Sequence, residues 1–178
     1  MAMMETRAIP MTVKVQSGSL VKVYADESRT RMLKPGPDGW YSLSKNNLIT
    51  NGNSNVVANV VIQGIGTCQL HNNTEVIYEA GDAILSDVFT LKNGSFRYKT
   101  TDNKSGLSGR KKIVKTRSRS LGTKGTEFSV SLNKNDAVPT FYLKVFSGIV
   151  VANLLSNEND IKEYPAEFAQ RLDDNVTK

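Results

Sequence analysis

Cysteine, histidine and tryptophan are almost missing from this chain of 178 residues, which contains one of each. One cysteine cannot form an intramolecular disulfide, and one cysteine with one histidine cannot supply a zinc site of the Cys/His kind. A Ser-His-Asp or Cys-His enzyme would depend on His71 alone. We therefore expect a protein that is not an enzyme, with no catalytic residue, no metal, no cofactor and no small-molecule substrate.

Long hydrophobic runs are also missing. The longest apolar stretch, Phe146 to Leu155, is interrupted by Ser147, Gly148 and Asn153 and is about half as long as a membrane span. The first ten residues lack the pattern of a secretory signal. With 39% hydrophobic and 22% charged residues, the composition is typical of a globular domain, and we expect no membrane span.

What the chain does have is alternation of apolar and polar residues with period two, as in Val13, Val15, Val21 and Val23. Short runs of this kind recur about every 8–12 residues, separated by turn residues. They predict an all-β fold, a sandwich or solenoid-like stack of about ten short antiparallel strands. The pair Asn93-Gly94 predicts a two-residue hairpin turn between two of these strands.

Only the C-terminal region changes character. Pro165 suits a first helical turn, and Phe168 and Leu172 have the i, i+4 spacing of one helix face. We expect a short amphipathic helix near residues 165–173. The expected organisation is an extended N-terminal arm over residues 1–11, a β domain over 12–152, and a tail with the short helix over 153–178.

Positive charge is concentrated in one segment. The net charge is +6, and residues 97–124 hold ten Lys and Arg against one acid, Asp102. One interpretation is a surface that binds an acidic partner or a polyanion such as nucleic acid. The other is a solvated loop whose charges keep an edge strand soluble. The residues alone leave both open.

Candidate chemistry elsewhere is sparse. Cys68 and His71 are three residues apart, so on a strand they face opposite sides, and a buried thiol beside a loop imidazole is the simplest interpretation. The acidic pair Asp173-Asp174 lies in the tail, with no indication that its carboxylates face each other. Thr126, Phe128 and Val130 share one strand face and predict core positions. We expect the following to be largely buried: Val13, Val15, Trp40, Val57, Ile84, Phe128, Val130, Val145 and Val150.

The middle of the chain resembles a FecR domain. The similarity covers about residues 12–152, and its most distinctive part is the Gly-Thr-x-Phe-x-Val sequence of residues 125–130. Other matching parts are Trp40 with the segment 43–52, and the closing strand 143–151. The resemblance implies an all-β periplasmic module that relays a signal from an outer-membrane transporter to a sigma factor. The sequence has neither a membrane span nor a helical anti-sigma segment, so a plain β interaction module fits it better.

These observations favour a structural or protein-interaction module. We expect an assembly subunit of a large particle such as a phage virion (tail, baseplate or capsid-associated), made in the host cytoplasm and located in the virion. The alternatives are a periplasmic FecR-like signalling or scaffold module, and a nucleic-acid-binding protein that uses residues 97–124. Partners are expected to be other protein subunits, through this interaction surface: Met3, Met4, Ile9, Arg110, Lys111, Lys112, Lys115, Arg117, Arg119, Phe168 and Leu172.

Overall fold

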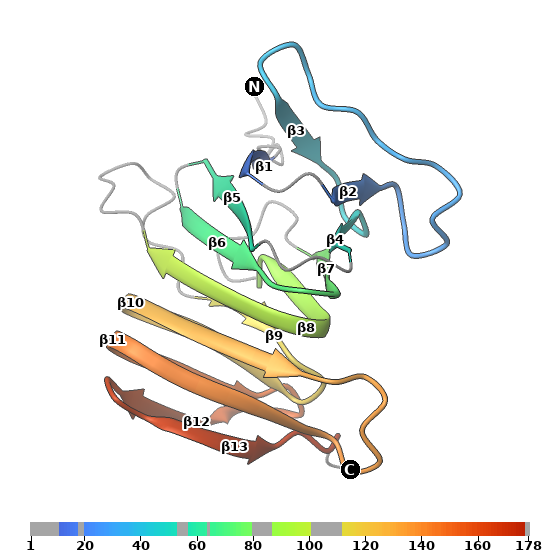
Figure 1. The fold of residues 1–178 in the computed structure, drawn as a ribbon. Helices are drawn as coiled ribbons and strands as arrows, with labels where there is room; N and C mark the ends of the chain where they lie inside the picture. The colour runs from blue at the N-terminus through green and yellow to red at the C-terminus, as the bar shows by residue number, and fades with distance from the viewer. Residues whose placement is uncertain are drawn as a thin grey trace, which may run out of the picture.

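The protein is all-β. A computed structural model describes residues 11–17, 20–52, 57–63, 65–79, 87–100 and 112–176, and among these it contains strands and no helix (Figure 1). None of the described residues belongs to a helix that could cross a membrane. The strands are β1 (Met11–Ser17), β2 (Val21–Tyr24), β3 (Trp40–Leu43), β4 (Leu48–Asn51), β5 (Ala58–Ile62), β6 (Gly66–Leu70), β7 (Thr74–Tyr78), β8 (Phe89–Thr100), β9 (Lys112–Lys115), β10 (Arg119–Leu132), β11 (Thr140–Leu154), β12 (Asn157–Pro165) and β13 (Ala169–Asp173).

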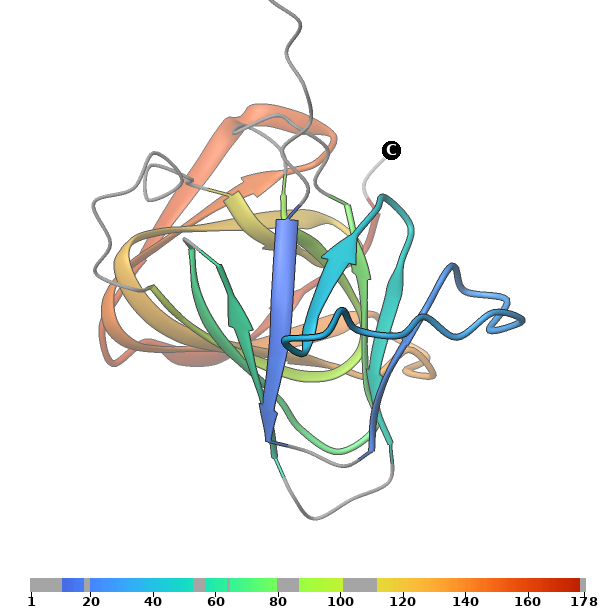
Figure 2. The same ribbon diagram turned by 90° about the horizontal axis from the view of Figure 1, so that it is seen from above.

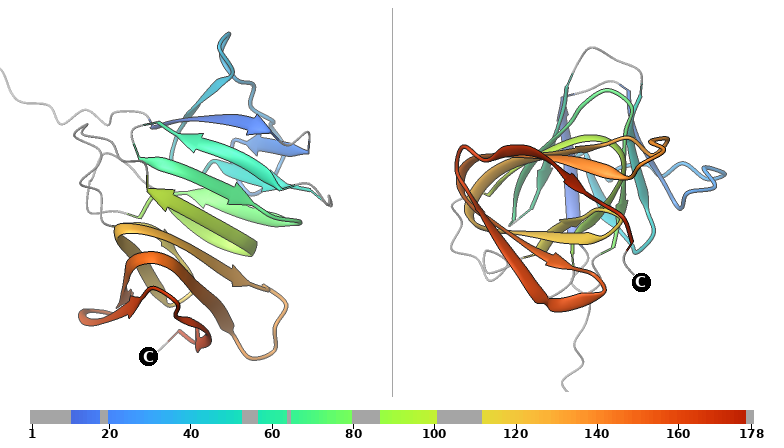
Figure 3. Two further views of the ribbon diagram at one scale, coloured as in Figure 1. Left: turned by 60° about the vertical axis from the view of Figure 1, so that its left-hand side comes forward. Right: turned by 90° about the horizontal axis from the view of Figure 1, so that it is seen from below.

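Most of these strands belong to bent layers that follow one another along the chain. Each layer is either two consecutive short strands or one long strand, and it pairs antiparallel with the layers beside it. Figures 1 and 3 show the layers stacked in chain order, from blue at one end to red at the other. The layers are β1–β2, β4–β5, β6–β7, β8, β10, β11 and β12–β13. β3 is added beside β1, and β9 lies between β8 and β10.

The bend in each layer creates two walls, and Figure 2, seen from above, shows strands on both sides of an interior. The β6 wall contains β3, β1, β5, β6, the second halves of β8 and β10, the first half of β11, and β13. The β7 wall contains β2, β4, β7, the first half of β8, β9, the first half of β10, the second half of β11, and β12. Because β8, β10 and β11 run through both walls, the walls form one unit around a shared core.

Glycines stand where two of the long strands bend. Gly94 has φ 96° and Gly148 has φ 73°, in the left-handed region that glycine adopts without strain. At Gly94, β8 changes its partner from β7 to β6, and near Gly148, β11 changes its partner from β13 to β12. The expected hairpin at Asn93-Gly94 is therefore wrong. The same preference for positive φ that favours a hairpin turn here bends a continuous strand.

We expect Gly94→Ala to destabilise the protein by more than about 1 kcal/mol, because alanine does not adopt the positive φ of this position without strain. A Cβ at this position would lie 2.4 Å from Thr74 Oγ1 and 2.5 Å from Thr74 Cα. Urea denaturation of the original protein and of the variant measures the difference in the free energy of unfolding. Gly52→Ala is the control, because its φ is not positive and a Cβ there would make ordinary contacts with Leu20. Equal stability of all three proteins would contradict the bend.

The core between the walls is built around aromatic rings. Tyr78 contacts Phe89 at 6.1 Å between centroids, and Phe89 contacts Phe96 in the opposite wall at 5.9 Å. Tyr98 then contacts Phe128 at 5.9 Å. Of the expected core residues, Val13, Phe128, Val130, Val145 and Val150 are buried. Val15, Trp40 and Val57 are half-buried, and Ile84 lies outside the described residues.

The expected helix near residues 165–173 is not present, and the segment is a turn followed by β13. The turn is fixed by backbone hydrogen bonds from Glu167 N to Val145 O and from Val145 N to Phe168 O. Residues 169–173 then pair with residues 140–144 of β11. A helix of two turns has little stability of its own, whereas the strand completes the edge of β11. The segment expected to be a tail thus supplies the last layer of the stack.

Candidate functional site

The cations of segment 97–124 do not gather on one surface. Arg97 and Lys99 lie in the part of β8 that belongs to the β6 wall. Lys112 and Lys115 lie in β9 of the β7 wall, and Arg119 begins β10. Arg110 and Lys111 lie outside the described residues, as do Met3, Met4 and Ile9 of the expected arm.

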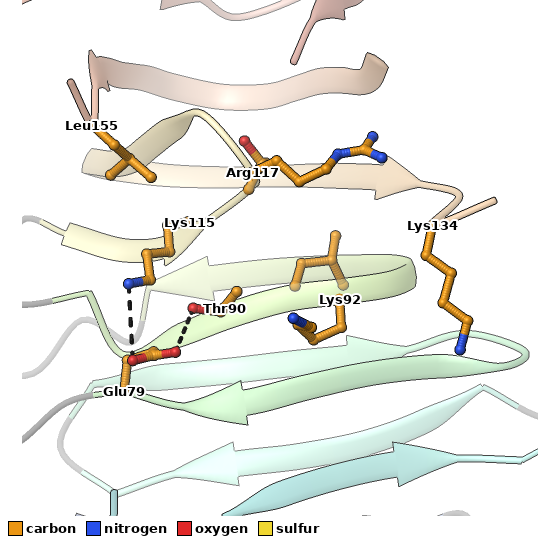
Figure 4. Close-up of a pocket in the computed structure, with 9 residues that line it drawn as sticks. Glu79, Thr90, Lys92, Lys115, Arg117, Lys134 and Leu155 are labelled. Atoms are coloured by element: carbon orange, nitrogen blue, oxygen red, sulfur yellow. Dashed lines mark hydrogen bonds and ion pairs between the residues drawn. The ribbon is translucent and has the colours of Figure 1, made fainter. Parts of the chain in front are cut away.

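A pocket of about 370 Å³ lies on the outer side of the β7 wall and contains two of the expected site residues, Lys115 and Arg117 (Figure 4). We call it the Glu79 pocket, because Glu79 accepts a hydrogen bond from Thr90 Oγ1 at 2.8 Å and faces Lys115 across it. Four cations and one carboxylate line it. The full lining is Glu79, Thr90, Leu91, Lys92, Lys115, Thr116, Arg117, Lys134 and Leu155.

Each cation of the Glu79 pocket lies near a carboxylate, and the carboxylate of Glu75 is shared by Lys134 and Arg29. The distances are 3.8 Å for Lys115–Glu79, 4.0 Å for Lys92–Glu27, 3.1 Å for Lys134–Glu75 and 2.9 Å for Arg117–Asp174. Opposite charges this close largely cancel the field that an incoming anion would sense. The three lysine pairs are partly exposed and contribute little stability, whereas Asp174, the partner of Arg117, is fully buried.

Asp174 holds the turn between β9 and β10. Its side chain is fully buried and accepts hydrogen bonds from Thr116 Oγ1 at 2.7 Å, Ser118 Oγ at 2.6 Å and Ser118 N at 2.9 Å. Arg117 adds a bond from Nε at 2.9 Å, and its Nη2 donates to Thr140 O at 2.9 Å. We call this arrangement the Asp174 clamp. It satisfies a buried charge with several donors, and it commits Arg117 to an internal partner.

A second group of cations lies on the outer face of the β6 wall. Arg97 forms an ion pair with Glu127, and its guanidinium carbon lies 3.8 Å from the centroid of the Phe146 ring. Lys144 Nζ lies 5.0 Å from the same centroid. The pKa of His71 is lowered, first by burial and then by the positive charge of Arg97. The guanidinium of Arg97 is thus held between Glu127 and Phe146, and the side chain of Lys144 is exposed.

Phe168 and Leu172, the expected contact residues of the C-terminal segment, are half-buried and pack against the core of their own chain. The Phe168 ring contacts the Tyr164 ring at 4.5 Å between centroids. Their i, i+4 spacing suits a helix, yet here one residue lies in a turn and the other in β13. Both side chains close the interior at the last layer.

Cys68 is a buried core residue, as its position on a strand suggested. Its side chain is 2% exposed, and burial raises the pKa of the thiol to about 12. We expect no reaction with a thiol reagent at pH 8 in the native protein and full reaction in 6 M guanidinium chloride, because the thiolate is the reactive form. Labelling followed by mass spectrometry measures this. Rapid labelling of the native protein would show that this part of the core opens.

The outer face of the β6 wall also contains cations that the charge of segment 97–124 did not predict. Lys14, Lys144 and Arg171 lie outside that segment but reach the same face through strand pairing. Period-two alternation in residues 141–146 places Lys144 and Phe146 opposite the buried Leu143 and Val145, so this signal was present. Nothing local signals that β1 and β13 belong to the same wall.

Among the described residues, no three His, Cys, Asp or Glu side chains are grouped so that they could hold a metal ion. No family model matches the chain, and no curated protein is significantly similar to it. The FecR resemblance of residues 12–152 therefore stays a prediction.

Proposed function

We propose that this chain is a non-enzymatic interaction module that serves as an assembly subunit of a larger particle, such as a tail, baseplate or capsid-associated protein of a phage virion. The observation that carries the proposal is the open edge of the last layer. Within the described residues, β12 and β13 pair with β11 alone. An exposed strand edge accepts an extended segment of a partner protein through main-chain hydrogen bonds.

The side chains near this edge support a specific contact. Leu155 is 43% exposed and Ile161 is 55% exposed, so two apolar groups lie at the last layer. The pairing of β12 with β11 is irregular between Asn157 and Ile161, and Pro165 ends the strand. The regular part of the edge is therefore short, which favours one docking segment over uncontrolled edge-to-edge association.

Ile161→Asp tests the proposal, because it places a charge on the edge without disturbing the core. We expect incorporation of the variant into its native particle to fall at least about tenfold, the effect of losing about 1.4 kcal/mol of contact. Val138→Asp is the matched control, since Val138 is 66% exposed in the turn between β10 and β11. Light scattering gives the mass of the isolated chain and of the particle. Normal incorporation of Ile161→Asp, with an unchanged melting temperature, would contradict the proposal.

The second candidate is a periplasmic FecR-like signalling or scaffold module. It is favoured by residues 125–130, where the family-like sequence lies in β10 with Thr126, Phe128 and Val130 buried. Genetic context separates the two candidates. Structural phage genes beside this gene would support the assembly subunit, whereas genes for a sigma factor and an outer-membrane transporter would support the signalling module.

A further inference from the structure

The outer face of the β6 wall is a continuous sheet surface on which outward side chains form rows across the strands. One row follows the strand pairs from Trp40 and Lys14 through Val61, Thr67 and Lys99 to Glu127. The next row contains Asn59, Gln69, Arg97, Ser129, Lys144 and Ala169. A third contains Ser95, Ser131, Tyr142 and Arg171. We call this surface the β6 face.

Counted over the residues that the structure describes, the β6 face has more cations than carboxylates. Among the described residues its cations are Lys14, Arg97, Lys99, Lys144 and Arg171, and its carboxylates are Glu127 and, at the margin, Asp136 and Asp173. Within the described part of the chain, one of these five cations forms an ion pair, namely Arg97 with Glu127. The contrast with the Glu79 pocket is direct, because there every cation is paired.

Aromatic rings hold several of these cations on the face. Lys14 Nζ lies 5.9 Å from the Trp40 ring centroid, and Arg97 and Lys144 both lie over Phe146. The Arg97 side chain stays 36% exposed, so its guanidinium is presented to solvent while its position is fixed by Phe146 and Glu127. Planar guanidinium groups and aromatic rings are both surfaces on which nucleobases stack.

The length of the β6 face suits an extended polyanion. From β1 to β13 the path crosses six strand intervals, which at about 4.8 Å each gives about 29 Å. Single-strand-binding sheets of the OB type cover about 4–16 nucleotides with aromatic platforms and a cationic track. The middle of the face holds Thr, Ser, Gln and Lys side chains, whereas the centres of protein interfaces are apolar and poor in lysine.

We propose that the β6 face binds single-stranded nucleic acid, with phosphates at Lys14, Lys99, Lys144 and Arg171 and a base against the Arg97–Phe146 pair. This activity goes beyond the proposed assembly role and uses other residues than the open edge at Ile161. It also places the contact on residues drawn from four strands, β1, β8, β11 and β13, and two of these residues, Arg97 and Lys99, lie within segment 97–124.

The test is fluorescence anisotropy of the full chain with a labelled oligothymidylate of twelve nucleotides across a salt series. We expect the logarithm of the association constant to fall with the logarithm of salt concentration with a slope of about −3, because four neutralised phosphates of a single strand give about −0.7 each. The double variant K99Q/K144Q should bind at least about tenfold more weakly in 50 mM salt, with a slope nearer to about −1.4.

The double variant K92Q/K134Q is the matched control, since it removes the same charge from the Glu79 pocket on the other wall. It should bind the oligonucleotide within about twofold of the original protein, and circular dichroism checks that both variants are folded. Equal weakening by the two double variants would overturn the site. Binding of an acidic peptide, or of a duplex, as tight as that of the single strand would overturn the ligand class, and no binding at 100 μM protein would overturn the activity itself.

Discussion

Replacing Asp174 by alanine is expected to lower the free energy of unfolding by about 3–5 kcal/mol, the usual cost of removing one partner from a buried, hydrogen-bonded ion pair. Alanine would leave the donors of Thr116, Arg117 and Ser118 without the carboxylate that now accepts from all three. The turn between β9 and β10 and the end of the last layer would lose their shared contact. Urea denaturation followed by circular dichroism measures the change.

The neighbouring residue gives a matched control. Asp173 is exposed, so Asp173→Ala should change stability by no more than about 0.5 kcal/mol. Asp174→Asn keeps the size and part of the acceptor capacity, and we expect a loss between those of the two alanine variants. Similar stability of the two alanine variants would mean that the Asp174 clamp contributes little.

Phe128→Ala is expected to cost about 3–5 kcal/mol, as is usual when a buried phenylalanine is truncated. The side chain is fully buried at the centre of β10 and contacts Tyr98 of the neighbouring strand. Its loss would leave a cavity that both walls border, because the core is shared. Thermal and urea denaturation give the size of the effect, and a loss below about 1 kcal/mol would show that Phe128 does not anchor the core.

Phe146→Ala is the matched control for Phe128→Ala, because it truncates the same residue type at a position that is less buried. Phe146 lies in β11 on the outer face and is half-buried against Arg97, so we expect a loss of less than about 1.5 kcal/mol. Comparable losses for the two phenylalanines would be inconsistent with the assignment of inner and outer faces.

The sequence was most informative where alternation decides which face a residue occupies. Thr126, Phe128 and Val130 were expected on one inward face of a strand, and all three are buried. The all-β class follows from the same signal, because period two recurs along the chain and a side chain in a strand has only two directions. The buried thiol of Cys68 follows from it as well.

Two local signals were ambiguous, and tertiary pairing decided between their meanings. Asn93-Gly94 favours positive φ, which serves a hairpin turn or a bend in a strand, and the presence of both β6 and β7 beside β8 selects the bend. The spacing of Phe168 and Leu172 suits a helix, but it also suits a turn followed by a strand, and the open edge of β11 selects the strand.

The site residues were harder to foresee, because they come from distant parts of the chain. Asp174 and its partner Thr116 are 58 residues apart, and nothing near either one indicates the other. The density of cations in segment 97–124 was visible, but their division between two walls depends on how β8, β9 and β10 pair. Charge counted along a sequence does not predict charge on a surface when adjacent strands turn to opposite sides.

The order of the layers has a consequence for how the protein folds. Each layer contacts mainly the layers before and after it in the chain. The free energy of unfolding of the protein should therefore resemble that of a repeat protein, as the sum of each layer's own stability and the contacts between neighbouring layers. A central layer such as β8 or β10 is supported from both sides, whereas β12–β13 is supported from one. Amide hydrogen exchange should therefore be slowest in β8 and β10 and quicken toward the last layer, so that the molecule loosens from its end while its middle stays folded.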